Sequence, residues 1–470
     1  MPSLYCRRRR EQFGLMATAC STDRVSNSTG SGPGESAPWP SSSRGWFTVA
    51  IFFVTAILSY TDRLIFSLLV DPVRGSLGIS DFQVGLAQGT SFAIVYGVAG
   101  LPAGRLADIA NRRNLLLIGT ITWSIGTVAC GFATGMASLI GARILVAAGE
   151  ALLAPAAMSM IADLFPQERR GSPTAVFLSG MNVGSGLAIV IGGGVLSLAQ
   201  SGAFNALGVD HVEPWRTTLT LIGVLGVPVL ALLLLIREPQ RRAAGDQGKR
   251  PFTDVLKEMW RGWKRLLPIF AALAAFTTVD FSLISWVPTL LSRDFAIPAW
   301  EVSNGFGLVI LVSGFLGTVV GGFAADKLFR RGGNAHRLRA TAWLALSGGL
   351  PLIFLTIAPA AYIVAISAFW LFISAVATVC AIATAQDLVP ADAKGLCISF
   401  IAMGNISLGL GIGASLPGAL TSGAVDGPSG LSWAITAVAV PLAAMAAYLC
   451  GVNSRSAQGG SPHAMPRAAS

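Results

Sequence analysis

Five ionisable side chains lie within long apolar stretches of the sequence. They are Asp62, Arg63, Arg143, Glu150 and Asp280. A charged group in hydrocarbon costs about 2.5 to 3.5 kcal/mol even on a lenient scale, so each should be paired or should face a water-filled cavity. Carboxylates in such places can take up and release protons, and guanidinium groups suit phosphate or carboxylate groups.

The spacing of these residues would let four of them meet where their helices lie side by side. Arg143 and Glu150 are seven positions apart, so two helical turns place them on one face of a helix. With a rise of about 1.5 Å per residue, Glu150 comes within reach of the long Arg63 side chain. We therefore expect a charged cluster of Asp62, Arg63, Arg143 and Glu150. The alternative is a static ion-pair network that only orients helices.

Three further polar residues are candidates for a binding cavity. Asp280 has no arginine neighbour in its own apolar stretch. It could bind a cationic group or a second proton, or it could form a structural hydrogen bond to a neighbouring helix. Asn182 and Asn405 lie in glycine-rich stretches, where a hydrogen bond between helices is the favoured use.

Composition indicates that membrane helices hold these residues. Of the 470 residues, 53% are hydrophobic and 12% are charged, against about 25% charged in ordinary soluble domains. Crossing a bilayer takes about 20 mostly apolar residues. Twelve such helices are predicted, at 46–70, 83–104, 115–134, 138–163, 172–199, 217–237, 266–291, 301–325, 338–358, 360–386, 396–422 and 429–451.

The basic residues, which give a net charge of +10, predict the orientation of these helices. With both termini in the cytoplasm, Arg74, Arg216 and Arg293 lie outside and Arg63 and Arg143 lie within helices. All other basic residues fall in tails and inward loops, as the positive-inside rule requires. The charge therefore needs no nucleic-acid partner to explain it. The six cysteines show no paired spacing, so we expect no disulfide, metal or cofactor.

Polar stretches divide the chain into five parts. Residues 1–44 and 453–470 are predicted to be disordered cytoplasmic tails, and 238–265 a cytoplasmic linker with an amphipathic helix. Between them lie the predicted six-helix bundles 45–237 and 266–452.

An internal repeat relates the two bundles. Gly104, Asp108, Arg112 and Arg113 recur 218 positions later as Gly322, Asp326, Arg330 and Arg331. The stretch DLFPQERRG from Asp163 recurs as DLVPADAKG from Asp387, 224 positions later. Matches in the same order are what a duplicated half produces.

The chain resembles the major facilitator superfamily over residues 46–452. The resemblance rests on six plus six helices, a long central loop and a Gly-x-x-x-Asp-x-x-x-Arg-Arg motif in each half. A basic residue usually follows the aspartate. Ile109 stands there in the first half, whereas Lys327 keeps it in the second. YTDR at 60–63, GEALLAP at 149–155 and DLFPQERRG resemble the Spinster-like branch.

The resemblance implies a cytoplasmic gate built from the repeated motifs. Asp108 would face the start of the eleventh helix, where the helix dipole favours a carboxylate. Arg112 would reach Asp163, and Asp326, Arg330 and Asp387 would mirror this arrangement. Alternatively, these arginines only enforce topology. The expected gate set is Gly104, Asp108, Arg112, Arg113, Asp163, Glu168, Arg170, Asp326, Arg330, Arg331 and Asp387.

The resemblance also implies a function. We expect a monomeric, proton-coupled secondary transporter that works by alternating access in a bacterial inner membrane. Its substrate would be a lysolipid-like amphiphile or a small organic anion. No metal-spaced histidine pair, GxSxG elbow or nucleotide-binding loop occurs, so we expect neither an enzyme nor an ATP-driven pump. The alternative is a non-transporting sensor or scaffold.

Overall fold

The computed structural model describes residues 39, 41–166, 169–203, 212–241, 261–389, 394–423 and 429–458. Every element within these ranges is helical and belongs to one compact unit, Trp39–Ser470. Most of the predicted N-terminal tail, residues 242–260 of the predicted linker, residues 459–470 and the candidate Glu168 lie outside the described part. The five-part division of the chain therefore stays a prediction.

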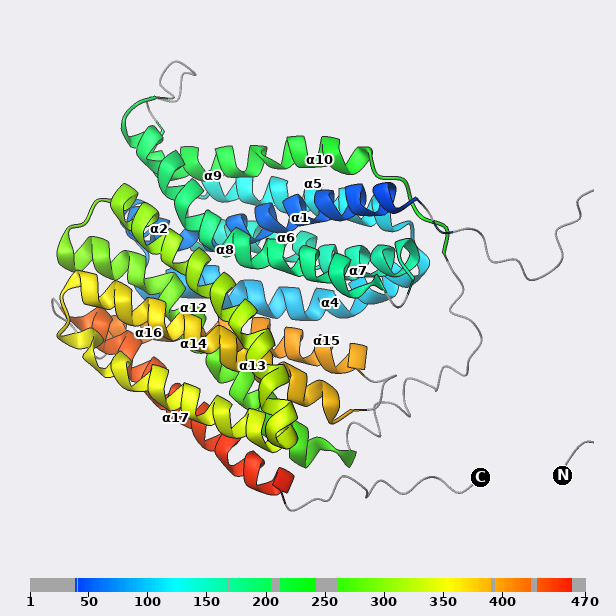
Figure 1. Ribbon diagram of the computed structural model, residues 1–470. Coiled ribbons are helices and arrows are strands. Elements are labelled where there is room, and N and C mark those ends of the chain that lie inside the picture. Colours follow the sequence, from blue (N-terminus) through cyan, green and yellow to red (C-terminus); the bar gives the residue numbers. More distant parts are fainter. Residues whose placement is uncertain are drawn as a thin grey trace, which may run out of the picture. The chain divides into compact units, whose positions relative to one another are not determined.

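Most helices of the first half lie in the upper part of Figure 1, and most of those of the second half lie in the lower part. The elements of the first half are α1 (Ser42–Leu64), α2 (Phe66–Leu77), α3 (Asp81–Gly85), the π-helical turn η1 (Leu86–Thr90), α4 (Ser91–Ile109), α5 (Arg112–Gly131), α6 (Met136–Glu150), α7 (Leu153–Leu164), α8 (Gly171–Gln200), α9 (Pro214–Val224) and α10 (Gly226–Leu234).

The second half repeats this plan with fewer breaks. Its elements are α12 (Trp263–Phe295), α13 (Ala299–Gly349), the 3-10 helix η4 (Leu350–Thr356), α14 (Ala360–Asp387), α15 (Lys394–Gly404), the π-helical turn η6 (Asn405–Leu410), α16 (Gly411–Gly423) and α17 (Gly430–Gln458). The halves touch where α8 packs on α13 and where α3 packs on α16.

Eleven helical segments of the described chain are long and apolar enough to cross a membrane. One of them, Ala299–Thr356, has 58 residues, far too many for one crossing of a hydrocarbon core about 30 Å thick. It breaks at Gly332 and Gly333, and the φ of +63° at Gly333 favours glycine. This segment therefore crosses twice, and the predicted all-helical, twelve-span membrane protein is confirmed.

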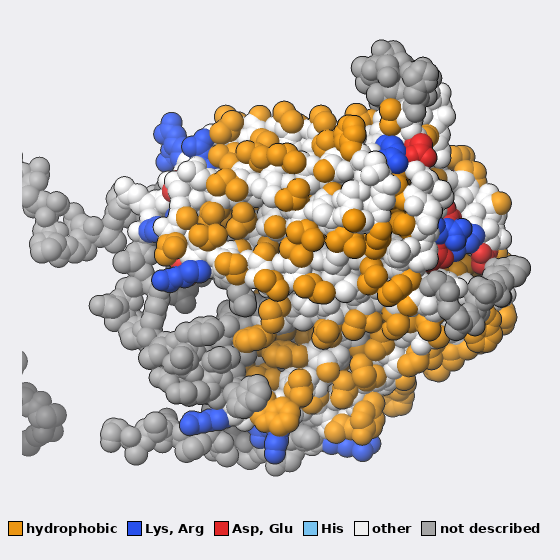
Figure 2. Space-filling model, turned by 180° about the vertical axis from the view of Figure 1, so that it is seen from behind, with side chains coloured by type: hydrophobic (Ala, Val, Ile, Leu, Met, Phe, Trp, Pro, Cys, Tyr) orange, Lys and Arg blue, Asp and Glu red, His pale blue; other side chains and the backbone are white. Residues whose placement is uncertain are grey.

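Apolar side chains cover the middle of the surface in Figure 2, and charged side chains gather toward its ends. Phe323, Trp343 and Ile357 are more than two thirds exposed, as expected of residues that face lipid. The first segment runs to Leu77 rather than to the predicted residue 70. Its last turns are amphipathic, with Val70 and Val73 buried beside the polar Asp71 and Arg74. Because the polar residues lower the mean hydropathy, a hydropathy average places the end of this helix too early.

Candidate functional site

A buried ion pair joins Arg63 of α1 to Glu150, the last residue of α6. The Arg63 Nε lies 3.1 Å from Glu150 Oε2, and the Nη2 of Arg63 donates to the same oxygen. Both side chains are at most 2% exposed. The guanidinium carbon also lies 4.5 Å from the ring centre of Tyr60 and 4.7 Å from that of Phe92. Arg63 is thus held by one carboxylate and an aromatic cage.

Asp62 points to a different neighbour from Arg63. Its carboxylate accepts a hydrogen bond from the Thr127 hydroxyl of α5 and is 2% exposed. Among the described residues it forms no ion pair, although it interacts electrostatically with Glu150 and Arg143. The structure therefore brings the four predicted residues into one region, but only Arg63 and Glu150 bond directly.

Arg143 of α6 binds backbone rather than a carboxylate. Its Nε and Nη2 each lie 3.4 Å from a carbonyl oxygen, those of Ala87 and Gln88 in the π-helical turn η1. Its guanidinium also lies 4.7 Å from the ring centre of Phe66. Because Arg143 is fully buried, this turn of the second membrane segment holds its charge in place.

Several buried polar atoms of this cluster have no hydrogen-bond partner among the described residues. They are Asp62 Oδ1, Arg63 Nη1, Gln88 Oε1, Arg143 Nη1 and Glu150 Oε1. Buried polar atoms are nearly always bonded to protein or to ordered water. The cluster is therefore equipped to hold water or a polar solute.

Asp280 of α12 lies apart from this cluster. Its two carboxylate oxygens accept hydrogen bonds from Trp370 Nε1 and Ser374 Oγ of α14, both at 2.8 Å. This geometry fits the structural alternative. The carboxylate is nevertheless partly exposed, so its role in binding stays a prediction. Asn405 begins the turn η6, and its side chain bonds to no described residue; the Asn182 side chain lies outside the described part.

Arg112 sits at the centre of a buried network at one end of the first half. Its guanidinium donates to Asp163 of α7, and its Nε lies 2.7 Å from Glu238 Oε1. It also donates to the carbonyl oxygen of Ser159 at 3.2 Å and to that of Pro239 at 2.9 Å. Asp163 and Ser159 belong to the first half, and Glu238 and Pro239 begin the predicted linker that follows it.

The matching network of the second half uses a different arginine from the one predicted. Asp387 pairs with Arg337, whose Nη1 lies 2.6 Å from Asp387 Oδ2, while Arg330 is exposed. Arg337 stands 225 positions after Arg112. This separation is close to the 224 positions between Asp163 and Asp387, whereas Arg330 stands only 218 positions after Arg112. Seven extra residues around the Gly332–Gly333 break explain the change. Arg330 was therefore the wrong equivalent.

The remaining predicted gate residues are peripheral in this conformation. Asp108 and Asp326 are exposed and form no ion pair within the described ranges. The Asp108 carbonyl accepts from Arg241, and the Arg113 amide donates to Glu238 Oε2 at 2.9 Å. Gly104 has open space where a Cβ would lie. Arg170 donates to the Phe165 carbonyl at 2.9 Å, and Arg331 is exposed.

Sequence reasoning missed a charged network at the opposite end. Arg293, at the end of α12, lies 2.5 Å from Asp71 Oδ1 of α2 and 2.9 Å from Asp81 Oδ2 of α3. Thr421 of α16 also donates to Asp81, at 3.4 Å. This network joins the two halves. The available signal was two acidic residues at segment ends on the outer side, where only three arginines are predicted to lie.

Close backbone contact between the halves continues along α3 and α16. Thr90 donates to the Gly411 carbonyl at 2.8 Å and lies 2.7 Å from the Ser415 hydroxyl. Within the second half, Trp286 Nε1 of α12 donates to the Ala414 carbonyl of α16 at 2.9 Å. A Cβ at Gly85 would lie 2.6 Å from that same carbonyl oxygen. The Arg293 end is therefore sealed by packing as well as by charge.

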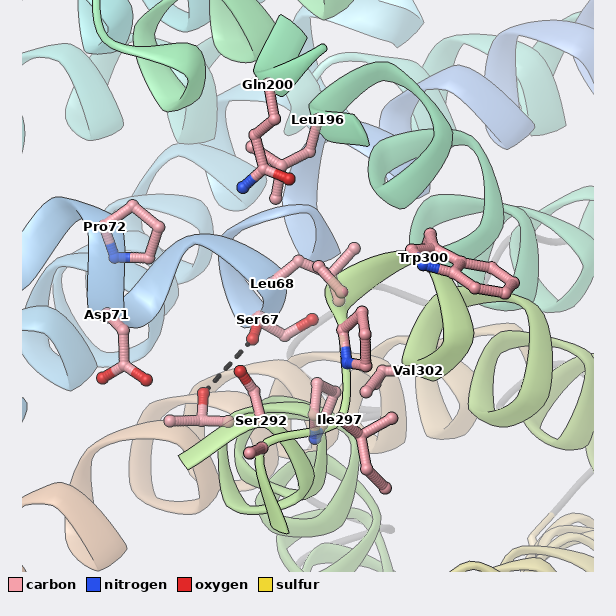
Figure 3. Close-up of a pocket in the computed structure, with 15 residues that line it drawn as sticks. Ser67, Leu68, Asp71, Pro72, Leu196, Gln200, Ser292, Ile297, Trp300 and Val302 are labelled. Carbon is pink, nitrogen blue, oxygen red and sulfur yellow. Dashed lines mark hydrogen bonds between the residues drawn. The ribbon is translucent and has the colours of Figure 1, made fainter. Parts of the chain in front are cut away.

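A cavity of about 370 Å³ opens beside the Arg293 network (Figure 3). Four helices line it: α2, the end of α8, the end of α12 and the start of α13. Polar Asp71, Gln200 and Ser292 share its wall with apolar Leu68 and Ile297. Asp71 also binds Arg293, so the cavity and the network have a residue in common.

Residues 51–414 match the family model of the Major Facilitator Superfamily. This match covers most of the chain, and the chain belongs to that superfamily of membrane transporters. It is similar to an MFS-type efflux pump of Mycolicibacterium smegmatis, with 32% identity over 61% of this chain and 64% of the relative. It is also similar to Protein spinster of Drosophila melanogaster, with 28% identity over 61% of this chain and 46% of the relative. The expected Spinster-like resemblance is thus confirmed, although the chain spans less than two thirds of these relatives.

Solved structures share the fold. A bacterial homolog of the human lysosomal transporter Spinster, in an inward-facing and unoccupied conformation, superposes with a TM-score of 0.79. The identity is 22%, over 90% of this chain and all of the other. A D-xylose-proton symporter superposes with a TM-score of 0.63 at 16% identity, over 85% of this chain and 96% of the other.

Proposed function

We propose that this protein is a proton-coupled secondary transporter that works by alternating access. The observation that supports this most is the Arg63–Glu150 pair, a desolvated ion pair inside a membrane segment. When a proton binds Glu150, the carboxylate becomes neutral and releases the Nε and Nη2 donors of Arg63. Those donors can then bind an anionic group of the substrate. Proton and substrate binding are thereby linked.

The distribution of ion pairs supports a conformation closed at one end. Arg293 links the two halves. The Arg112 network joins the first half to the start of the linker, and the Arg337 pair stays within the second half. If the termini are cytoplasmic, as the positive-inside rule predicts, the sealed end is the outer one. We place the protein, as a monomer, in a bacterial inner membrane.

The substrate we propose is an amphiphile of lysolipid type or a small organic anion. The name of one relative refers to D-galactonate, a sugar acid, and supports the organic anion. The amphiphile is what the Spinster-like resemblance implies. A thermal-shift screen of the purified protein against lysolipids and sugar acids would separate them. The sensor or scaffold alternative predicts no stabilisation by either class and no flux.

A Glu150→Gln variant in liposomes tests the coupling step. The amide keeps the size of the side chain but cannot gain or lose a proton, so we expect uptake that no longer depends on pH. Glu301→Gln is a matched control, since its carboxylate is exposed and unpaired within the described ranges. If Glu150→Gln kept both the uptake rate and the pH dependence of the wild type, coupling through Glu150 would be excluded.

A further inference from the structure

The π-helical turn η1 interrupts the second membrane segment at the level of the charge cluster. A π-helical turn holds one extra residue, which disturbs the regular pattern of backbone hydrogen bonds, and such turns are frequent at functional sites. Here the Ala87 and Gln88 carbonyls accept the Arg143 guanidinium of α6. The turn therefore contacts a buried cation directly.

Gln88 also reaches across to the other half. Its side chain is fully buried, and its Nε2 donates to the Ser285 hydroxyl of α12 at 3.2 Å. Ser285 is fully buried as well. A buried amide is costly unless it is bonded, so a residue kept only for packing would be apolar here.

Gln88 is thus bonded both to the charge cluster and to the second half of the protein. Its backbone carbonyl binds Arg143, which interacts electrostatically with Asp62. Its side chain binds α12, the helix that ends in the Arg293 network. The charged and titratable groups of the described chain around Arg143 and its partners are Asp62, Arg63, Tyr60, Tyr96, Cys130 and Glu150.

We propose that Gln88 is a positioning residue that links the charge cluster to the contact between the halves. This inference rests on the proposed proton-coupled transport. When a proton neutralises an acid of the cluster, the electrostatic force on Arg143 changes. Arg143 then shifts the η1 carbonyls that it binds. The shift moves the Gln88 amide relative to Ser285 and weakens the contact that keeps α3 on the second half.

Spin labels on the sealed end test this link without any substrate. Phe82 of α3 and Phe295 of α12 are both partly exposed and lie in different halves, so cysteines there report the separation. Cys6 and Cys20 are replaced by serine, because the four other cysteines are buried. Distances are measured by double electron–electron resonance in nanodiscs at acidic and neutral pH.

The wild type should show a pH-dependent change in the population with widely separated labels. Gln88→Met keeps the volume and the backbone carbonyl but loses the amide, and it should reduce this pH response at least threefold. Ser285→Ala removes the partner of the Gln88 amide and should reduce the pH response to the same extent. The double variant should reduce the response no further than either single variant. The control Ser367→Ala removes a buried hydroxyl that bonds only within its own helix, and it should respond like the wild type.

Two results would overturn the inference in different ways. If the wild type responds to pH and both single variants respond equally, Gln88 does not link the two regions, while proton coupling stands. If the wild type itself shows no response, proton coupling fails and the inference fails with it. Should Gln88→Met not fold, Ser285→Ala still decides, because it leaves Gln88 intact.

Discussion

At the scale of single residues, two buried arginines of the first half are neutralised in different ways. Arg63 binds the Glu150 carboxylate inside an aromatic cage, whereas Arg143 binds two backbone carbonyls. Only the first arrangement can be switched by a single proton. This difference is why we assign the coupling step to Arg63 and Glu150.

Removal of one partner of the Arg63–Glu150 pair should cost more stability than removal of both. A lone buried charge typically costs about 3 to 5 kcal/mol, while an apolar replacement of the whole pair is far milder. We expect Glu150→Met to lower the Tm strongly and Arg63→Met/Glu150→Met to recover most of the loss. Methionine suits the cage because its sulfur packs well on aromatic rings. A double variant that is less stable than Glu150→Met would contradict this account.

Glu213 lies just before α9, outside the membrane segments, and its protonation should make the stability of the protein depend on pH. Hydrogen bonds from Ser76 and Arg216 lower the pKa of its carboxyl group. A lowered pKa stabilises the folded state above the ordinary glutamate value of about 4.3, and this contribution is lost as the pH falls through the lowered pKa. We expect Glu213→Gln to be less stable at neutral pH by at most about 1 kcal/mol, since the site is exposed. The Tm gap to the wild type should close in acid; a gap of equal size at both pH values would contradict it.

The elements themselves were largely predictable from hydropathy, because apolar runs of this length can only be membrane helices. What failed was the assignment of contacts at their ends. The seven extra residues between Asp326 and Arg337 break the register of the repeat, so the shift of 218 points to Arg330 and not to Arg337. Gln88 lies in the π-helical turn Leu86–Thr90 inside an apolar stretch, where hydropathy alone does not single it out.

Close packing between α3 and α16 should make Gly85 intolerant of any side chain. A Cβ there would lie 2.6 Å from a backbone oxygen, and backbone cannot rotate away. We expect Gly85→Ala to lower the stability by about 1 to 3 kcal/mol. Gly100→Ala is the matched control, since nothing lies within 4 Å of its Cβ position; it should be neutral or stabilising by up to about 1 kcal/mol. Thermal unfolding in detergent would decide, and equal Tm values for the two variants would refute the packing argument.

At the scale of the whole molecule, the ion pairs of Arg293 with Asp71 and Asp81 join the two halves at the sealed end. Arg293 bridges acids from the first half, although it is more than 200 positions away from them in sequence. No periodicity could have paired these residues, because the pairing depends on how the halves meet. The charge cluster could be predicted, since two of its members share one helix face.

Loss of Arg293 should open the sealed end. We expect Arg293→Met to increase labelling of Ser67→Cys by a membrane-impermeant thiol reagent several-fold, because Ser67 is buried beside α12. Arg74→Met is the control: Arg74 also pairs with Asp81 but within the first half. If both variants labelled alike, Arg293 would not be the residue that holds the halves together.

The most direct test of proton-coupled transport is accumulation in liposomes that contain the purified wild-type protein. Lysolipids and sugar acids are offered with and without an imposed pH gradient. We predict that a member of one class accumulates above equilibrium only with the gradient, and that a protonophore abolishes the accumulation. Uptake that is the same with and without the gradient, or no uptake of either class, would contradict the account.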